Sequence, residues 1–247
     1  MRDDLGADVP LAAPATRIVS LVPSLTEALA ASAPDRLVGA TEWCTHPADL
    51  DVPRVRGTKN PDLAAIRALA PDLVVANMEE NRELDVRRLR DSGVAVWVTR
   101  IETVEEAIGS MSRLFRIALG MADPPWLVEA RSLWATPAPH RLSVVVPIWR
   151  DPWMVVGSPT YTDDLLTRAG LTNALADRDG RYPAVEPADI DDAGADVVLL
   201  PDEPYVFTAD DGPEVFTTPT RLVSGRLLTW YGPAMVEAHE LLVNLQP

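Results

Sequence analysis

Short apolar segments rich in β-branched residues alternate along the chain with longer segments of helical periodicity. The apolar segments predict strands at residues 18–22, 37–40, 73–76 and 94–98, and again at 142–146, 154–156, 197–200 and 221–223. Helix-start signals lie between them. Ser24 to Glu27 and Thr103 to Glu106 have the capping-box pattern, and Asn60-Pro61 has the pattern of an N-cap followed by proline at the first helical position. Strands that alternate with helices indicate parallel sheets.

The middle of the chain is helical and separates two such α/β patterns. Apolar residues recur at helical spacing from Val104 to Ala118, and a second helix is expected over residues 126–135, before Pro137. We therefore expect an α/β fold of two lobes with mainly parallel central sheets, joined by a helical linker. The expected boundaries are a tail at 1–16, a first lobe at 17–102, the linker at 103–139 and a second lobe at 140–247.

Charge and composition exclude several classes of protein. The 37 acidic and 22 basic residues give a net charge of −15, and no basic face is available for nucleic acid. No apolar run approaches the roughly 20 residues that span a bilayer. The N-terminal residues lack the apolar core of a secretory signal, and the single cysteine, Cys44, fits a reducing compartment. These features predict a soluble cytoplasmic protein; export is the alternative if a leader has been removed.

Ligands of open α/β sheets bind beyond the carboxyl ends of the strands. Four of the seven tryptophans and the only lysine follow predicted strands in this way. The expected ligand-binding residues are Trp43, Lys59, Asn60, Asn77, Glu80, Trp149, Arg150, Trp153, Tyr182, Trp230 and Tyr231. Flat aromatic rings suit a large, rigid, partly apolar ligand. The alternative for each tryptophan is packing where a loop crosses the edge of a sheet.

Signals for catalysis and for metal binding are weak. Glu42, Cys44 and His46 lie within five residues of one another, but no second cluster of cysteines and histidines completes a metal site. The sequence has no nucleophile elbow, phosphate-binding loop or zinc-protease motif. We therefore predict no catalytic residue and no bound metal. The run that begins at Asn77 is either a polar ligand contact or the capped start of a helix.

Five segments together resemble one known family. They are residues 17–27 (RIVSLVPSLTE), 57–63 (GTKNPDL), 71–74 (PDLV), 149–157 (WRDPWMVVG) and 228–233 (LTWYGP). In this order they are similar to the helical-backbone (class III) solute-binding proteins of ABC importers, and most of all to the cobalamin-binding members. The similarity runs from about residue 17 to the C-terminus. It implies two lobes bridged by a long helix, with the ligand held in a cleft between them.

The resemblance also implies roles for individual positions. Trp43 falls where cobalamin receptors carry an aromatic residue in the cleft, whereas Lys59 and Asn77 replace tryptophans of other members. Lys59 is therefore expected either to contact an anionic ligand group or to face solvent. Ala64 and Ala188 align with the surface glutamates through which the binding proteins of importers dock onto the permease.

The expected helix at 126–135 is short for a helix that bridges two lobes. The charges that would dock the protein onto a permease are also not at their usual positions. Asp62, Glu186 and Asp189 are the nearest acidic substitutes.

Three functional hypotheses follow from the sequence. The first is an intracellular protein of the solute-binding fold that holds a corrinoid, a metal chelate or a similar planar ligand and is not a standard import receptor. The second is the substrate-binding component of an ABC importer for cobalamin or iron chelates. The third is an enzyme that acts on a tetrapyrrole-type substrate through Glu79, Glu80 and His46. The identity of the ligand, and whether cobalamin or a metal chelate is bound, is left open.

Overall fold

A computed structural model describes residues 1–246 and divides the chain into two compact units. Unit 1 consists of Met1–Ile101, Glu106–Glu129 and Tyr231–Pro233. Unit 2 consists of Glu102–Glu105, Ala130–Trp230 and the segment that begins at Ala234. Each unit has its own parallel sheet, so each is described separately.

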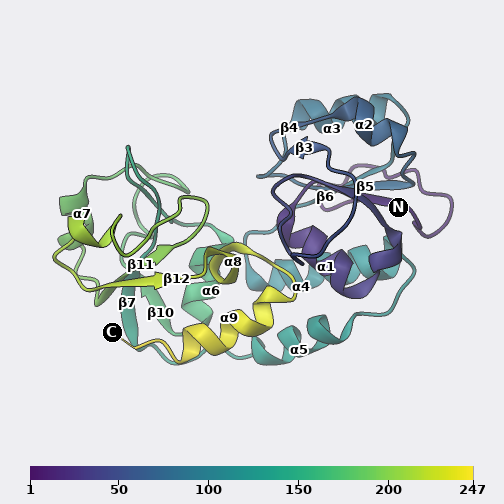
Figure 1. Ribbon diagram of the computed structural model, residues 1–247. Coiled ribbons are helices and arrows are strands. Elements are labelled where there is room, and N and C mark those ends of the chain that lie inside the picture. The colour runs from purple at the N-terminus through teal and green to yellow at the C-terminus, as the bar shows by residue number, and fades with distance from the viewer. Residues whose placement is uncertain (247) are drawn as a thin grey trace. The chain divides into compact units, whose positions relative to one another are not determined.

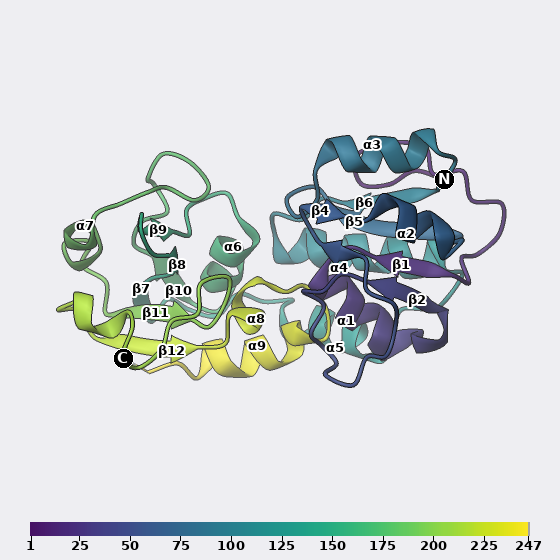
Figure 2. The ribbon, with the colours of Figure 1, turned by 45° about the horizontal axis from the view of Figure 1, so that its top comes forward.

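The sheet of unit 1 has four parallel strands in the order β2-β1-β5-β6. These strands are β1 (Ile18–Ser20), β2 (Leu37–Ala40), β5 (Leu73–Asn77) and β6 (Val96–Thr99). Helices α2 (Leu63–Ala68) and α3 (Glu83–Asp91) cover one face, and α1 (Pro23–Ser32) and α4 (Val104–Arg113) cover the other (Figures 1 and 2). A two-stranded antiparallel pair, β3 (Arg56–Gly57) and β4 (Asn60–Pro61), precedes α2. A short helix, η1 (Pro34–Arg36), precedes β2.

Asp62, and not Asn60, caps α2. The Asp62 carboxylate accepts hydrogen bonds from the backbone nitrogens of Ala64 and Ala65, each at 3.0 Å, which satisfies two free N–H groups of the first turn. Asn60 and Pro61 instead form β4. The helix start predicted at Asn60-Pro61 is therefore wrong by two residues, because a stronger capping group follows immediately.

The core of unit 1 between the sheet and helices α2 and α3 is aliphatic. Its buried members come from alternate positions of the strands, from α2 and α3, and from the segment before β3: Val19, Leu21, Val55, Ile66, Val74, Ala76, Val86, Leu89, Val96 and Val98. Burial on both faces explains why the strands read as continuous apolar runs.

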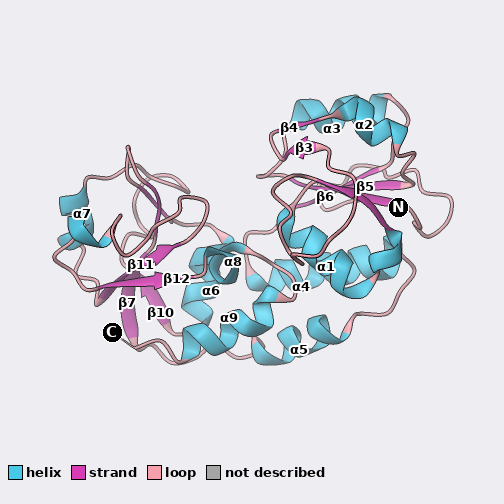
Figure 3. Ribbon diagram, viewed as in Figure 1, coloured by secondary structure: helices cyan, strands magenta, loops and turns pink. Residues whose placement is uncertain are grey.

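The sheet of unit 2 repeats this plan, with four parallel strands in the order β10-β7-β11-β12. The strands are β7 (Leu142–Val145), β10 (Leu171–Asn173), β11 (Val197–Pro201) and β12 (Thr220–Val223). An antiparallel pair, β8 (Pro147–Trp149) and β9 (Met154–Val155), follows β7. The helices are α6 (Tyr161–Arg168), α7 (Pro187–Asp191), α8 (Gly225–Thr229) and α9 (Ala234–Val243), with a short η3 (Pro213–Val215). Helix α7 lies on the opposite side of the sheet from α6 and α9 (Figures 1 and 3).

The segment expected as a linker, residues 103–139, contains three helical pieces. Helix α4 continues directly into a π-helical turn, η2 (Leu114–Ala118), and α5 (Pro125–Leu133) follows. The division between the two units falls inside α5, between Glu129 and Ala130.

The first residues of the chain, expected as a tail, pack onto unit 1. Asp3 is buried and forms an ion pair with Arg90 of α3, and Asp4 forms one with Arg113 of α4 at 2.7 Å. The predicted α/β class with parallel sheets is confirmed. Strand β10 was not predicted, because Leu171 is the one apolar residue among its three and no apolar run marks it.

Candidate functional site

The carboxyl ends of β1, β5 and β6 are joined by buried asparagines. The Asn77 amide donates to the Thr99 carbonyl and hydroxyl oxygens at 3.3 and 3.1 Å, and its Oδ1 accepts from the backbone of Glu79 at 2.8 Å. Its side chain is buried and fully hydrogen-bonded. Asn77 is predicted from the sequence to contact the ligand. This geometry favours a structural role instead, in which the Asn77 side chain holds the loop after β5 in place.

Asn81 completes this network and was not among the expected ligand-binding residues. Its Nδ2 donates to the carbonyl oxygens of Leu21 and Thr58 at 3.3 and 2.9 Å, and its Oδ1 accepts from the Asn77 N–H at 2.9 Å. One side chain therefore holds the segments that follow β1, β3 and β5. Its partners lie up to 60 residues away in the sequence, so no local pattern could reveal it.

Trp43, Lys59 and Asn60 are exposed residues of the same edge, the first two on loops and Asn60 at the start of β4. The Trp43 side chain is 66% exposed. Lys59, between β3 and β4, donates from Nζ to the carbonyl oxygen of Glu79. Asn60 and Trp43 both lie against Gly57: a Cβ there would be 2.5 Å from Asn60 Oδ1 and 3.2 Å from Trp43 Nε1. Three of the expected residues are thus gathered around one glycine and the loop after β5.

Tyr231 and Glu80 form the inner part of this edge. The chain returns to unit 1 at Tyr231–Pro233, and Tyr231 is buried there. Burial raises the pKa of the Tyr231 phenol far above its ordinary value, the Glu80 charge adds to this, and the Ser24 and Thr99 hydroxyls oppose it. Burial also raises the pKa of the Glu80 carboxyl, against the lowering effect of Lys59. Tyr231 therefore stays neutral at physiological pH, as a buried phenol beside Glu80 and the Ser24 and Thr99 hydroxyls.

The four expected tryptophans do not share one environment. In unit 2, Trp149 at the end of β8 is 43% exposed, whereas Trp153 is only 7% exposed. Trp153 stacks on Phe207 at 5.7 Å between ring centroids and meets Phe216 edge-on at 5.0 Å. Trp230 is also buried, and its carbonyl accepts from the Tyr161 hydroxyl at 3.4 Å. Packing thus accounts for Trp153 and Trp230, while Trp43 and Trp149 keep an exposed face.

Arg150 and Tyr182 complete the residues expected in unit 2. Arg150 forms ion pairs with Asp211 and with Glu214, the latter at 2.7 Å, and its guanidinium lies 5.4 Å from the ring centroid of Trp153. Its positive charge is therefore balanced within the unit. Tyr182, after β10, is exposed.

The segment from Glu42 to His46, whose signal for metal binding is weak, has a structural role at Cys44. Cys44 is buried, and the Thr26 hydroxyl donates to its sulfur at 2.9 Å. Burial raises the pKa of the Cys44 thiol. His46 is exposed beside the Thr45 hydroxyl. Across residues 1–246, no three side chains of His, Cys, Asp or Glu are grouped so as to hold a metal ion.

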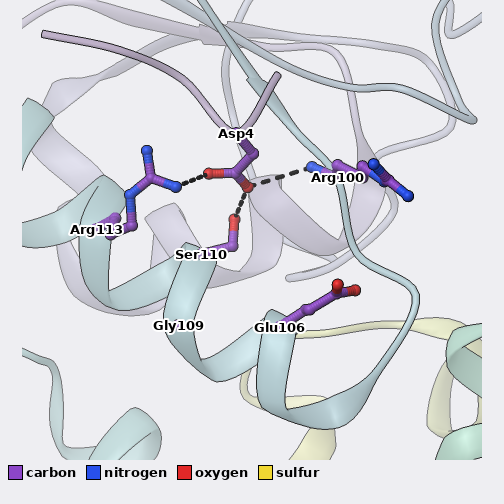
Figure 4. Close-up of a pocket in the computed structure, with 6 residues that line it drawn as sticks. All are labelled: Asp4, Arg100, Glu106, Gly109, Ser110 and Arg113. Carbon is purple, nitrogen blue, oxygen red and sulfur yellow. Dashed lines mark hydrogen bonds and ion pairs between the residues drawn. The ribbon is translucent and has the colours of Figure 1, made fainter. Parts of the chain in front are cut away.

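A separate pocket of about 370 Å³ lies in unit 1 beside the N-terminal segment (Figure 4). Asp4 projects into it and is bonded to Arg113, to the Ser110 hydroxyl and to the Arg100 backbone nitrogen. Arg113 also donates to the carbonyl oxygens of Arg2 and Asp3. None of the expected ligand-binding residues lines this pocket. Its polar groups fasten the N-terminal segment to unit 1.

Two α/β units with parallel four-stranded sheets, and exposed aromatic residues on loops at the carboxyl ends of their strands, are the features of a two-lobed solute-binding protein. Comparison with known proteins supports this class. The chain is 25% identical over 210 residues to a vitamin B12-binding protein of Vibrio cholerae, which covers 80% of this chain and 71% of the relative. It is also 25% identical over 194 residues to an uncharacterized ABC transporter substrate-binding lipoprotein of Bacillus subtilis, which covers 72% of this chain and 61% of that protein. No family model matches the chain.

Solved structures give the same fold. A periplasmic vitamin B12 binding protein of Vibrio cholerae superposes with a TM-score of 0.75 at 20% identity, covering 93% of this chain and 96% of that one. A periplasmic heme-binding protein from Roseiflexus sp. RS-1 gives 0.75 at 20% identity, covering 92% and 98%. A Helicobacter pylori protein solved with Ni(II) bound gives 0.81 at 14% identity, covering 98% and 87%. In sequence and in fold the chain is thus similar to the helical-backbone (class III) solute-binding proteins that its sequence motifs resemble.

These relatives correct one prediction and support another. The solved vitamin B12-binding and heme-binding proteins are periplasmic and the Bacillus subtilis relative is a lipoprotein, so the predicted cytoplasmic location is wrong, and the comparison points to an exported protein. The first functional hypothesis described an intracellular protein, and that location is wrong for the same reason. The misleading signals were the polar composition of residues 1–10 and the single cysteine. The relatives carry the names of binding proteins and not of enzymes, in agreement with the predicted absence of catalysis. Within the described part of the chain, no helix has the length and hydrophobicity needed to cross a bilayer.

Proposed function

We propose that this protein is the exported substrate-binding component of an ABC importer for a corrinoid or another planar tetrapyrrole-type ligand. The observation that carries the proposal is the sequence relationship, over most of the chain, to proteins named for vitamin B12 binding. The exposed rings of Trp43 and Trp149 support it, because they present flat apolar surface in the segments that follow the carboxyl ends of β2 and β7. Lys59 and Tyr231 add polar groups to the unit 1 edge.

Titration of the purified protein with cyanocobalamin and with haemin tests this function. Tryptophan emission is followed, and we expect saturable quenching by at least one of the two ligands. The variants Trp43→Phe and Trp149→Phe should each weaken binding by about tenfold, as expected for an aromatic contact that carries much of the binding energy. Trp126→Phe is the matched control. Trp126 lies on α5, where it packs against Phe115 and its indole N–H donates to the Ser32 hydroxyl. The ligand affinity of Trp126→Phe should therefore equal that of the wild type. Absence of saturable quenching by both ligands would contradict the proposal.

The partner we propose is an ABC permease, contacted by acidic residues at the start of α2 and of α7. Asp62 caps α2, and the exposed Glu186 caps α7 in a reciprocal capping box with Asp189. Asp62 and Glu186 stand two residues before the exposed Ala64 and Ala188.

The variants Asp62→Asn and Glu186→Gln remove the charge and leave a side chain that still accepts a hydrogen bond at the helix terminus. Ligand affinity should not change, whereas uptake of labelled cyanocobalamin by cells that contain the permease should fall. Unchanged uptake would exclude these two charges as the docking contacts.

A further inference from the structure

A row of aromatic rings in unit 2 leads from the exposed edge into the core. Trp149 meets Tyr205 edge-on at 5.8 Å, Tyr205 contacts Phe207 at 4.7 Å, and Phe207 stacks on Trp153. Trp149 is exposed, Tyr205 is partly buried, and the last two are buried. Trp149 is therefore the exposed end of a packed row whose inner end is fixed. Its only ring contact within the described chain is with Tyr205.

Asp211 fixes the middle of this row through its two carboxylate oxygens. The Tyr205 hydroxyl donates to Oδ2 at 2.7 Å, and Arg150 donates to Oδ1. Glu214 accepts from the same nitrogen of Arg150 at 2.7 Å, and the guanidinium lies over Trp153. Arg150 immediately follows Trp149 in the chain, so Asp211 restrains both the backbone next to Trp149 and the ring that contacts it.

A tight turn sets the position of Asp211. The Thr208 N–H donates to the Asp211 carbonyl at 3.0 Å, and the Asp211 N–H donates back to Thr208 at 3.4 Å. Gly212 follows with a φ of +125°, and a Cβ there would lie 2.7 Å from the Phe207 ring. The glycine thus permits the turn to close onto the row, which brings the Asp211 carboxylate between Tyr205 and Arg150.

We infer that Asp211 is a positioning residue for ligand binding: it holds Tyr205 and Arg150 so that the exposed Trp149 ring keeps one orientation in the ligand-free protein. Arg150, predicted as a direct ligand contact, acts with it as an internal support, because two carboxylates already occupy the guanidinium. A ring that is ordered before binding loses less conformational freedom when the ligand arrives, which raises affinity. This inference rests on the proposed function for its effect on affinity, but not for its effect on Trp149.

The test compares Asp211→Ala with Asp210→Ala. Both variants remove one aspartate from the same turn, but within residues 1–246 the exposed Asp210 side chain forms no hydrogen bond or ion pair, and its backbone N–H donates to the Thr208 hydroxyl. In the ligand-free protein, the indole N–H resonance of Trp149, assigned by its loss in Trp149→Phe, should shift and broaden in Asp211→Ala only. Tyr205→Phe, which keeps the ring and removes the hydroxyl, should show part of the same change.

Affinity for cyanocobalamin provides the second readout. Asp211→Ala should raise Kd by about tenfold and Asp210→Ala by less than about twofold. In a Trp149→Ala background, Asp211→Ala should cause no further loss, because it acts through that ring. An unchanged Trp149 resonance in Asp211→Ala, or affinity losses that multiply in the double variant, would overturn the inference. If the wild-type protein binds neither cyanocobalamin nor haemin, the proposed function fails, while the resonance of Trp149 still decides the role of Asp211.

Discussion

Arg90 and Asp3 form an ion pair in which Arg90 Nη2 lies 2.6 Å from Asp3 Oδ2, and the aspartate side chain is fully buried. The same carboxylate accepts hydrogen bonds from the backbone nitrogens of Leu5 and Ala7 at 3.0 and 2.9 Å, and from Val98 of β6 at 3.3 Å. One side chain near the N-terminus thus joins that segment to α3 and to the edge strand of the unit 1 sheet.

We predict that Asp3→Ala lowers the free energy of unfolding of unit 1 by about 3 kcal/mol, because it removes one partner of a buried pair and leaves several N–H groups without an acceptor. Urea unfolding followed by circular dichroism measures this. The control is Asp8→Ala, since Asp8 pairs with Arg2 in an exposed bridge that contributes little. Equal stability of the two variants would mean that the N-terminal segment does not support the unit.

The Cys44 thiol is predicted to be unreactive in the folded protein. It is buried, hydrogen-bonded by Thr26 and Thr41, and its pKa is raised by burial, so the nucleophilic thiolate is disfavoured. Labelling with a thiol reagent at pH 8 should be slow in buffer and become complete in concentrated urea. Rapid stoichiometric labelling of the native protein would contradict the burial of this residue.

Gly57→Ala is predicted to weaken ligand binding with little loss of stability. The new Cβ would approach Asn60 Oδ1 and Trp43 Nε1, and both side chains would have to move. We expect Kd for cyanocobalamin to rise by about threefold or more, while the free energy of unfolding changes by about 1 kcal/mol or less.

The control for Gly57→Ala is Gly109→Ala in α4, where a Cβ meets no atom within 4 Å. Alanine there should leave binding unchanged and stabilise the helix by up to about 1 kcal/mol. Similar affinities for the two variants would show that the position of Trp43 does not matter to the ligand.

Glu80 is predicted to lower the free energy of unfolding as the pH rises. A carboxylate in a salt bridge has the opposite effect, because its pKa is lowered on folding. Its folded-state pKa is raised above the ordinary 4.5 by burial, so the folded protein binds this proton more tightly than the unfolded chain. Its contribution to stability is therefore greatest below about pH 4.5 and is lost as the pH rises through the folded pKa. At pH 7, Glu80→Gln should be more stable than the wild type, and this advantage should disappear in acid.

Urea midpoints between pH 4 and pH 8 give that comparison, with Glu79→Gln as the control for loss of one charge at the exposed neighbouring position. If the wild type is more stable than Glu80→Gln at pH 7, the attraction of Lys59 for the Glu80 carboxylate outweighs the cost of burying it.

The fold could be predicted from the sequence because its signals are local. Buried parallel strands give apolar runs, and a capping group marks a helix start at Thr160, whose hydroxyl accepts from the Asp163 N–H. The capping box predicted at Ser24–Glu27 is wrong, because α1 already begins at Pro23, which can occupy the first helical turn without a backbone N–H. Where two local signals competed, as at Asn60-Pro61 and Asp62, the better hydrogen-bond acceptor determined the helix start.

The candidate site was predictable only in part, because exposure and long-range hydrogen bonds are not visible in a sequence. Trp149 and Trp153 are four residues apart and follow the same strand, yet one is exposed and the other lies among Phe207 and Phe216. Asp211 is 61 residues from Arg150, and nothing in its own segment indicates that partner. The Thr208 to Gly212 turn was the available signal, but it indicates a turn and not what the turn supports.

The Asn81 side chain has a consequence for how the unit 1 edge responds to a ligand. Because it bonds to Leu21, Thr58 and Asn77 together, the three segments behind Trp43 and Lys59 are constrained to move as one body. Recognition at this edge then needs no search through alternative loop arrangements. The association rate should consequently be governed by diffusion and orientation, and differences in affinity among related ligands should arise mainly in how slowly each one leaves.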